Sequence, residues 1–350
     1  MTLQNSSPSF LVIRRDNIGD LVCTTPLFRS LRERFPSARI CALVNSYNAA
    51  VLQGNPDIDE IFSYTKAKHR PSGQSVPRVY FDRVKMLARL RAMRFDYAIL
   101  ATPGFQERSL FLARMIRPRH ILGFTDKKNR ASRHVDMGVP FAFPPHLHEA
   151  EEVFRLLQAL GISGEPPVAT VHADKTEIGK VQTRLARTGQ GAGLTIGIHI
   201  SARKPSQRWP AECFSALIRS LREQYDARFI LFWSPGDENN PLHPGDDGKA
   251  EQMMQAIGDE PILAYPTQRL EELIAGLSLC DVVVCSDGGA MHLAAGLGKP
   301  ILCFFGHSDA AHWYPWGVPY VLLQPESRDV RDISVTEALV GFGELVEKAS

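Results

Sequence analysis

The segment at residues 281–298 constrains the fold of this chain more than any other stretch. It opens with an apolar run, VVVC at 282–285, which is typical of a buried parallel strand. The run breaks at Ser286-Asp287-Gly288-Gly289 and continues as an apolar helix. Free backbone N–H groups and the positive end of a helix dipole then meet at the edge of a sheet, where they can bind phosphate. The segment therefore predicts an anion site, although such a turn also occurs as a plain connection from strand to helix.

A second turn of the same kind lies near the N-terminus. FLVI at 10–13 is a buried-strand pattern, and the charged loop RRDNIGD at 14–20 follows it. A helix is expected from about residue 21 to residue 35, with Pro26 in its early part. Two strand-to-helix turns, one charged and one with a glycine pair, predict two sheets whose carboxyl edges face one cleft.

Strand and helix patterns alternate along both halves of the chain, which favours parallel sheets covered by helices on both faces. With 350 residues and 44% hydrophobic composition, the chain can bury two ordinary cores. The predicted fold class is therefore α/β, with two Rossmann-like doubly wound domains. We expect the first domain at residues 1–180, the second at 193–330 and a terminal helix at 334–350.

Short motifs occur in a characteristic order: RRDNIGD at 14–20, TTPL at 24–27, NPDIDE at 55–60, RWP at 208–210, SDGGAMHLAA at 286–295 and FGHSD at 305–309. Together they resemble glycosyltransferase family 9, the heptosyltransferases, over nearly the whole chain. The resemblance implies a GT-B fold whose terminal helix packs back on the first domain. It also implies inverting, metal-independent transfer of a sugar, in particular heptose from ADP-heptose, to an acidic glycan such as lipopolysaccharide inner core.

Asp20 is the predicted catalytic residue. Inverting sugar transfer needs a base that takes the proton of the acceptor hydroxyl, and the resemblance gives Asp20 this role. An aspartate at this position is also expected as a helix cap, which contributes about 1 kcal/mol. Asp16 is the competing carboxylate, and we expect it to hold the loop.

The predicted donor-binding residues share a position at strand ends in the second half of the chain. They are Ser201, Arg203, Lys204, Arg208, Glu238, Asp287, Gly288, Gly289 and His292. The family usually carries threonine at the position of Gly288 and lysine at that of Gln207. Lys204 or Arg208 is expected to supply the missing positive charge beside the departing diphosphate, and the sequence leaves that choice open. A solvated basic loop is the alternative interpretation.

Positive charge is concentrated in the first half. Residues 66–133 contain a surplus of 13 positive charges, whereas the whole chain has a net charge of +2. Such a surface attracts anionic partners, so an anionic glycan or glycolipid acceptor is predicted. Its predicted contacts are Arg15, Lys66, Lys68 and Arg70. Nucleic acid is the rival partner, but the chain has no recognised nucleic-acid motif.

No metal site and no cofactor are expected besides the nucleotide-sugar substrate. Asp57 and Asp59 have the spacing of a metal-binding pair, but they follow Asn-Pro, so a turn is predicted. The six cysteines lack Cys-x-x-Cys spacing and are expected to be reduced. The first residues carry no signal pattern, and no apolar run reaches the ~18 residues that span a bilayer. The sequence thus predicts a soluble, cytoplasmic protein, with peripheral contact to the inner membrane.

Two other functions remain open from sequence. One is a transferase or epimerase that uses a different nucleotide sugar. The other is a nucleotide-sugar-binding protein without turnover, because the family lysine and threonine are replaced by Gln207 and Gly288.

Overall fold

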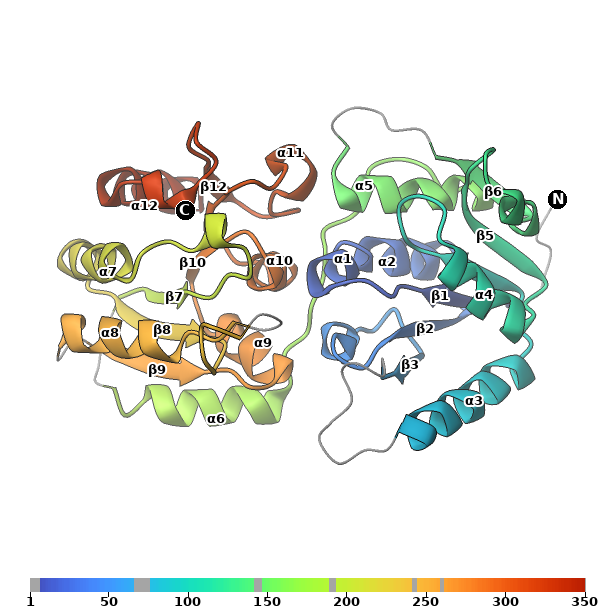
Figure 1. The fold of residues 1–350 in the computed structure, drawn as a ribbon, viewed down its shortest axis with the longest axis horizontal. Helices are drawn as coiled ribbons and strands as arrows, with labels where there is room; N and C mark the ends of the chain where they lie inside the picture. The colour runs from blue at the N-terminus through green and yellow to red at the C-terminus, as the bar shows by residue number, and fades with distance from the viewer. Residues whose placement is uncertain are drawn as a thin grey trace. The chain divides into compact units, whose positions relative to one another are not determined.

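The computed structural model describes residues 7–65, 76–141, 147–188, 193–240, 244–258 and 261–349. The chain divides into two compact units, Met1–Ala169 and Thr170–Ser350. Each unit is built on one six-stranded sheet in which every strand pair is parallel, with helices along it (Figure 1). The α/β prediction of two Rossmann-like doubly wound sheets is confirmed. That the two units face one cleft stays a prediction.

The first sheet has the strand order β3-β2-β1-β4-β5-β6. Its strands are β1 (Ser9–Ile13), β2 (Arg39–Asn45), β3 (Glu60–Tyr64), β4 (Tyr97–Leu100), β5 (His120–Thr125) and β6 (Met137–Pro140). The helices of this unit are α1 (Ile18–Val22), α2 (Thr25–Arg34), α3 (Val76–Ala92), α4 (Glu107–Ile116) and α5 (Glu149–Phe154), and α5 runs into the 3₁₀ helix η4 (Arg155–Leu160). This is the Rossmann order, and its switch point lies between β1 and β4.

The second sheet repeats this order, as β12-β11-β10-β7-β8-β9. Its strands are β7 (Thr195–His199), β8 (Arg228–Trp233), β9 (Ile262–Pro266), β10 (Val282–Ser286), β11 (Ile301–Phe304) and β12 (Tyr320–Leu323). The helices are α6 (Lys175–Leu185), α7 (Ala211–Tyr225), α8 (Asp247–Ile257), α9 (Leu270–Ser278), α10 (Gly289–Gly296), α11 (Ala310–Trp313) and α12 (Val335–Ala349). The switch point here lies between β7 and β10.

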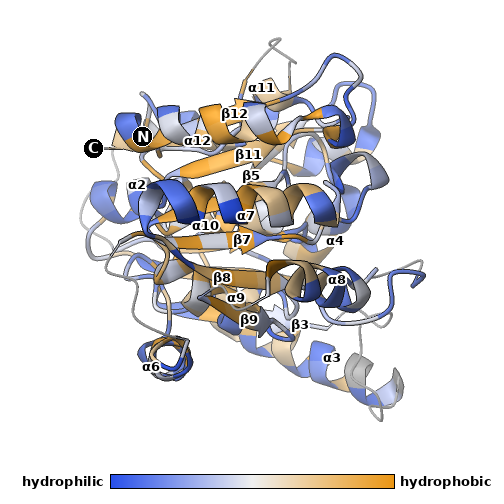
Figure 2. Cartoon of the chain, turned by 90° about the vertical axis from the view of Figure 1, so that its left-hand side faces the viewer, coloured by the Kyte–Doolittle hydropathy of each residue, from blue (hydrophilic) through white to orange (hydrophobic). Residues whose placement is uncertain are grey.

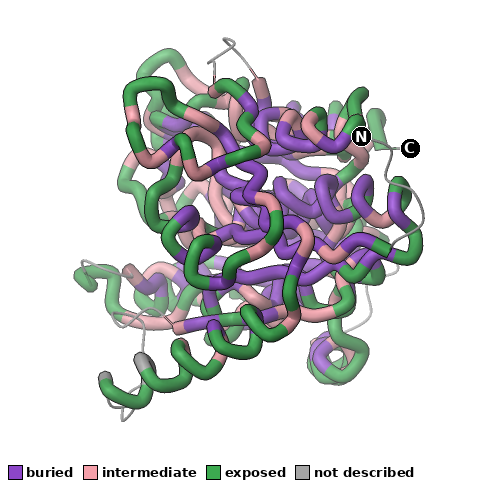
Figure 3. The backbone as a smooth tube through the Cα atoms, turned by 90° about the vertical axis from the view of Figure 1, so that its right-hand side faces the viewer, coloured by how far each residue is buried: buried purple, intermediate pink, exposed green. Residues whose placement is uncertain are grey.

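Apolar strands buried between layers of helices form the core of each unit. The strands of the second sheet are strongly hydrophobic, whereas α7 and α12 alternate between apolar and polar residues, as expected for helices with one buried face (Figure 2). A view from the other side shows buried backbone inside and exposed backbone on the outer helices and loops (Figure 3). All six cysteines are free, and five of them are buried.

The helix expected at residues 21–35 is two helices in the structure. α1 ends at Val22, and α2 begins at Thr25 with Pro26 in its first turn. A proline has no N–H and a fixed φ, so it fits the first turn of a helix but interrupts the interior. The proline therefore marks the start of a new helix.

The expected domain limits also need correction. The division falls at Ala169/Thr170, whereas a first domain of residues 1–180 would end inside α6. α6 contacts α9 and belongs to the second unit. The terminal helix α12 buries Ala338, Phe342 and Leu345 in the core of the second unit and contacts α7, β11 and β12. That a terminal helix at 334–350 packs back on the first domain stays a prediction.

Candidate functional site

The first switch point is organised by Arg14, the first residue after β1. Its guanidinium is almost completely buried, and its Nη1 donates to the carbonyl oxygen of Ala101, just after β4. Nη2 donates to Asp20 Oδ1 at 2.9 Å and to Glu149 Oε1 at 2.6 Å. Burial alone would lower the pKa of Arg14, but the charges of Glu149, Asp20 and Asp16 outweigh it and raise the pKa. Arg14 is therefore a permanent buried cation that holds several carboxylates.

Asp20 is the third residue of α1, and both of its carboxylate oxygens are engaged. Oδ1 accepts from Arg14, and Oδ2 accepts from the backbone N–H of Asn17 at 2.8 Å. The side chain is 15% exposed, so it keeps an edge open to solvent. The expected cap at the helix start is thus present in part: Asn17 is the N-cap residue, and Asp20 binds its N–H from inside the helix. An ordinary cap has no buried arginine behind it, and this contact distinguishes Asp20.

The other polar residues of this loop are held in place. Asp16 Oδ2 lies 3.0 Å from Arg14 Nε and accepts from the Thr102 hydroxyl, also at 3.0 Å, so it ties the loop to the end of β4, as predicted. Arg15 Nε donates to the hydroxyl of Tyr64, at the end of β3. Lys66, Lys68 and Arg70 lie outside the described residues, and their predicted role at the acceptor stays a prediction.

The second switch point contains the turn from β10 to α10. Gly288 and Gly289 begin the helix, as expected, and a Cβ added at Gly288 would meet no atom within 4 Å. The space around Gly288 is therefore open, at the end of α10 whose N–H groups can bind an anion. His292 is buried rather than open, with its ring edge-to-face against Trp313.

Gln207 connects the loop after β7 to this turn. Its Nε2 donates to Asp287 Oδ2 at 2.6 Å and to the Ser308 hydroxyl at 2.9 Å. Lys204 Nζ reaches the same Ser308 hydroxyl at 3.3 Å, and the side chain of Lys204 is otherwise exposed. The structure thus brings the amine of Lys204 to the same hydroxyl that Gln207 binds.

Arg208 lies in a different environment. Its Nη1 donates to the carbonyl oxygen of Ala202 at 3.0 Å, and its Nη2 forms a close ion pair with the buried carboxylate of Asp246. Burial raises the pKa of Asp246, although Ser201 and the charge of Arg208 act in the opposite direction. The positive charge of Arg208 is therefore balanced by the carboxylate of Asp246. Of the two cations that the sequence left open, Lys204 is the one next to the Gln207–Asp287 pair.

Lys249 of α8 fixes the loop between these residues. Its Nζ donates to the carbonyl oxygens of Ile200 at 3.1 Å and Trp209 at 2.6 Å, which bracket residues 201–208. Burial lowers the pKa of Lys249 to about 8 and that of nearby His199 to about 4. Trp209 is fully buried and donates to the carbonyl oxygen of Ile333, so the loop is anchored at its far end.

The remaining predicted donor residues are less constrained. Ser201 Oγ accepts from the N–H of Ser234, while Arg203 and Glu238 are exposed. Sequence reasoning missed Glu149, Ser308 and Lys249. Glu149 is 135 residues from Arg14, and no local motif marks it.

The polar groups of Asp57 and Asp59 bond within the protein. Asp59 Oδ2 accepts from Arg32 Nη2 and from the Ile40 N–H, and Asp57 is buried in its turn. Across the described ranges, no group of three His, Cys, Asp or Glu side chains is placed to hold a metal ion. Nor does any described helix combine the length and apolar character needed to cross a bilayer.

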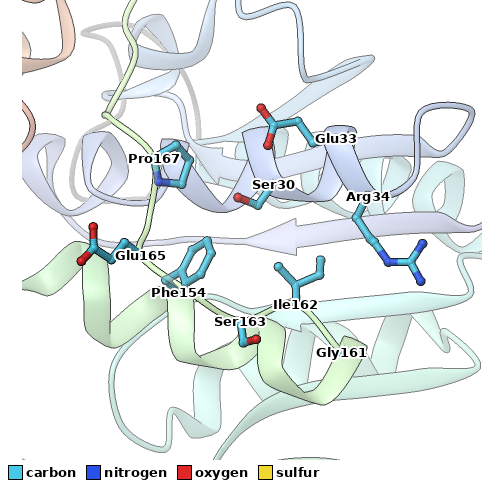
Figure 4. A pocket seen from close by; sticks show the side chains of 9 residues that line it. All are labelled: Ser30, Glu33, Arg34, Phe154, Gly161, Ile162, Ser163, Glu165 and Pro167. Atoms are coloured by element: carbon cyan, nitrogen blue, oxygen red, sulfur yellow. The ribbon is translucent and has the colours of Figure 1, made fainter.

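A cavity of about 530 Å³ lies elsewhere in the first unit (Figure 4). It is lined by the end of α2 and the segment after η4, including Glu33, Arg34 and Ile162. α2 begins five residues after Asp20, and its ten residues extend about 15 Å. The cavity therefore lies at the opposite end of α2 from the switch point and is not part of the candidate site.

Two parallel sheets in Rossmann order, with polar side chains at both switch points, are the architecture of the GT-B class, and solved structures share this fold. The glycosyl transferase family 9 protein from Veillonella parvula DSM 2008 matches with a TM-score of 0.81 and 19% identity over 97% of both chains. The E. coli ADP-heptose lps heptosyltransferase II matches with a TM-score of 0.76 and 18% identity over 97% of this chain and 99% of that chain. The fold therefore defines a protein of the GT-B class.

The family model described as glycosyltransferase family 9 (heptosyltransferase) matches residues 83–335, which is more than half of the chain. The protein belongs to glycosyltransferase family 9. Lipopolysaccharide heptosyltransferase 3 of Escherichia coli is 23% identical over 300 residues, covering 85% of this chain and 83% of the relative. Lipopolysaccharide heptosyltransferase 2 of strain K12 is 23% identical over 311 residues, with 85% and 83% coverage.

Proposed function

We propose that this glycosyltransferase moves heptose from ADP-heptose to the inner core of lipopolysaccharide, with inversion and without a metal ion. The observation that carries the proposal is its similarity, over 85% of the chain, to relatives named lipopolysaccharide heptosyltransferase. A structural neighbour with a TM-score of 0.74 is an E. coli heptosyltransferase with ADP-2-deoxy-2-fluoro heptose. The donor class follows from that likeness.

In the proposed reaction Asp20 is the base. It takes the proton of an acceptor hydroxyl while that oxygen attacks the anomeric carbon, and the bond from that carbon to the diphosphate breaks on the opposite face. The carboxylate suits this role because the contacts with Arg14 and the Asn17 N–H hold it in one orientation, while part of its surface stays open. Arg14 also pairs with Glu149 and Asp16, so its positive charge is shared among three carboxylates and is not spent on Asp20 only.

The departing ADP carries the charge that builds up in this step. The N–H groups at the start of α10 and the amine of Lys204 are the proposed partners of its diphosphate. These groups replace the positive charge that a metal ion supplies in other transferases. Addition of a chelator is therefore expected to leave the rate unchanged.

The test compares nucleotide sugars as ligands and as substrates. ADP-heptose should raise the midpoint of thermal unfolding more than UDP- or GDP-sugars, because a ligand stabilises the native state according to its affinity. Mass spectrometry of a core glycolipid that lacks heptose should then show the addition of one heptose. Preference for another nucleotide sugar would contradict the proposal. So would chemical conversion of the nucleotide sugar when no acceptor is present.

The epimerase alternative has weaker support. A UDP-N-acetylglucosamine 2-epimerase from Listeria monocytogenes shares the fold with a TM-score of 0.52 and 12% identity. The family 9 structures match better, at 0.74 to 0.81. No contact described here favours epimerisation over transfer.

A further inference from the structure

The first unit carries a groove between α3 and α4, and Arg15, a predicted acceptor contact, is part of its lining. Its volume is about 520 Å³. The floor consists of the buried side chains of Tyr64, Leu87 and Leu112, and the rim carries the exposed side chains of Val84 and Phe111. The two helices contact each other along the first sheet (Figure 1).

Large exposed apolar side chains are concentrated on these two helices. Among the described residues seven such side chains are exposed, and four of them belong to α3 or α4: Phe81 at 68%, Val84 at 62%, Phe111 at 63% and Met115 at 41%. Scattered single apolar residues are normal on a surface, but a cluster marks an interaction site. We call these four residues the α3–α4 apolar patch.

Cations outnumber acids on the two helices that carry the α3–α4 apolar patch. The two helices carry seven cations against two acids: Arg78, Arg83, Lys85, Arg89, Arg91, Arg108 and Arg114 against Asp82 and Glu107. Arg15 and Arg83 also line the groove, with both guanidinium groups over the ring of Tyr64. Exposed apolar side chains within a cationic border are typical of a surface that lies on an anionic bilayer.

We propose that α3 and α4 form a docking surface for an anionic lipid bilayer. The apolar patch inserts among the acyl chains at the headgroup boundary, and the surrounding arginines and lysine bind lipid phosphates. The inference rests on the proposed function in one respect, since it places the loop of Arg15 and Asp20 near a lipid-linked acceptor. The bilayer is preferred over a protein partner because cations outnumber acids seven to two on the two helices, and such an excess complements the negative surface of an anionic bilayer.

The test measures binding to vesicles separately from catalysis. The full chain should sediment with phosphatidylcholine vesicles that contain phosphatidylglycerol, and far less with phosphatidylcholine alone. A Val84→Ser/Phe111→Ser variant should bind at least about tenfold more weakly, because two buried apolar side chains are lost from the lipid contact. Raising the salt concentration should weaken binding of the original chain, because it screens the cations.

Val340→Ser is the matched control. Val340 is 57% exposed on α12, close to the exposure of Val84, but it lies in the second unit. This control should bind vesicles like the original chain. Both variants should also keep the transfer rate on an acceptor without acyl chains, so a loss of vesicle binding is not a loss of the enzyme.

Three results would overturn the inference. One is equal vesicle binding by the double variant and the Val340→Ser control. Another is equal binding of the chain to neutral and anionic vesicles. The third is a dimer in size-exclusion chromatography that the double variant dissociates, because the patch would then be covered by a second copy of the chain.

Discussion

The position of Asp20 is set by its partners rather than by the helix alone. A capping aspartate needs only a backbone N–H, and Asp20 has one from Asn17. Its second oxygen is held by Arg14, which is buried and also binds Glu149. An aspartate fixed at both oxygens loses little rotamer freedom on binding an acceptor, which is the requirement for a positioned base.

Replacing Asp20 by asparagine is expected to lower kcat by roughly 100-fold or more, because the amide cannot accept the acceptor proton. Calorimetry should show unchanged donor binding. Asp16→Asn is the matched control, since Asp16 also faces Arg14 but is held by Thr102. We expect it to lower kcat less than about tenfold. Similar losses in both variants would contradict the assignment of the base.

Lys204 is the second residue whose role depends on its neighbours. Lys204→Met should raise the donor KM and lower kcat by about tenfold, since one charge beside the diphosphate is lost. Adding Gln207→Lys should restore activity, because that position already contacts Asp287 and Ser308. Steady-state kinetics of the single and double variants provide the measurement. If the Lys204→Met/Gln207→Lys variant folds but stays inactive, a lysine at position 207 does not supply the charge that we assign to Lys204.

At the scale of elements, α12 is part of the second core and not an appendage. Phe342 is fully buried and packs edge-on against Tyr225 of α7. The amphipathic pattern of α12 reveals that one face is buried, but not which sheet buries it. Contacts with β11, β12 and α7 made that choice.

Phe342→Ala is expected to lower the free energy of unfolding of the second unit by about 3–5 kcal/mol, because the truncated side chain leaves a cavity. All four tryptophans lie in the second unit, at positions 209, 233, 313 and 316, so tryptophan fluorescence in urea follows that unit. Val340→Ser on the exposed face of the same helix should change stability by less than about 0.5 kcal/mol. A small effect of Phe342→Ala would place α12 outside the core.

At the scale of the whole molecule, each switch point gathers residues from several strand ends, and some are buried without a charge partner. His199, the last residue of β7, is the clearest case. Burial and the charge of Lys249 lower its pKa to about 4, and its Nδ1 has no hydrogen-bond partner among the described residues. The folded state therefore keeps this imidazole neutral where the unfolded chain would protonate it.

This shift predicts a loss of stability in acid. Between pH 6.5 and 4 the unfolded chain binds a proton at His199 that the folded chain does not, so the stability of the second unit falls as the pH falls. From pH 7 to pH 5 the contribution is about 2 kcal/mol. Urea unfolding followed by tryptophan fluorescence at both pH values measures it. Between pH 7 and pH 5, the His199→Asn variant should lose about 2 kcal/mol less unfolding free energy than the original chain. An identical loss in both proteins would exclude His199 as the cause.

The sequence by itself determined the architecture and the positions of the two turns. Strand and helix periods, and turn residues such as Gly288 and Gly289, act over a few residues, so both Rossmann sheets and the location of Asp20 could be predicted. Local patterns do not record which distant side chains meet. Only the tertiary structure decided that Glu149 contacts Arg14, that Lys204 rather than Arg208 shares the Ser308 hydroxyl with Gln207, and that α12 belongs to the second core. Each of these contacts depends on packing between elements far apart in the chain. Shape and charge complementarity determine which residues meet there, and the sequence alone does not distinguish the alternatives.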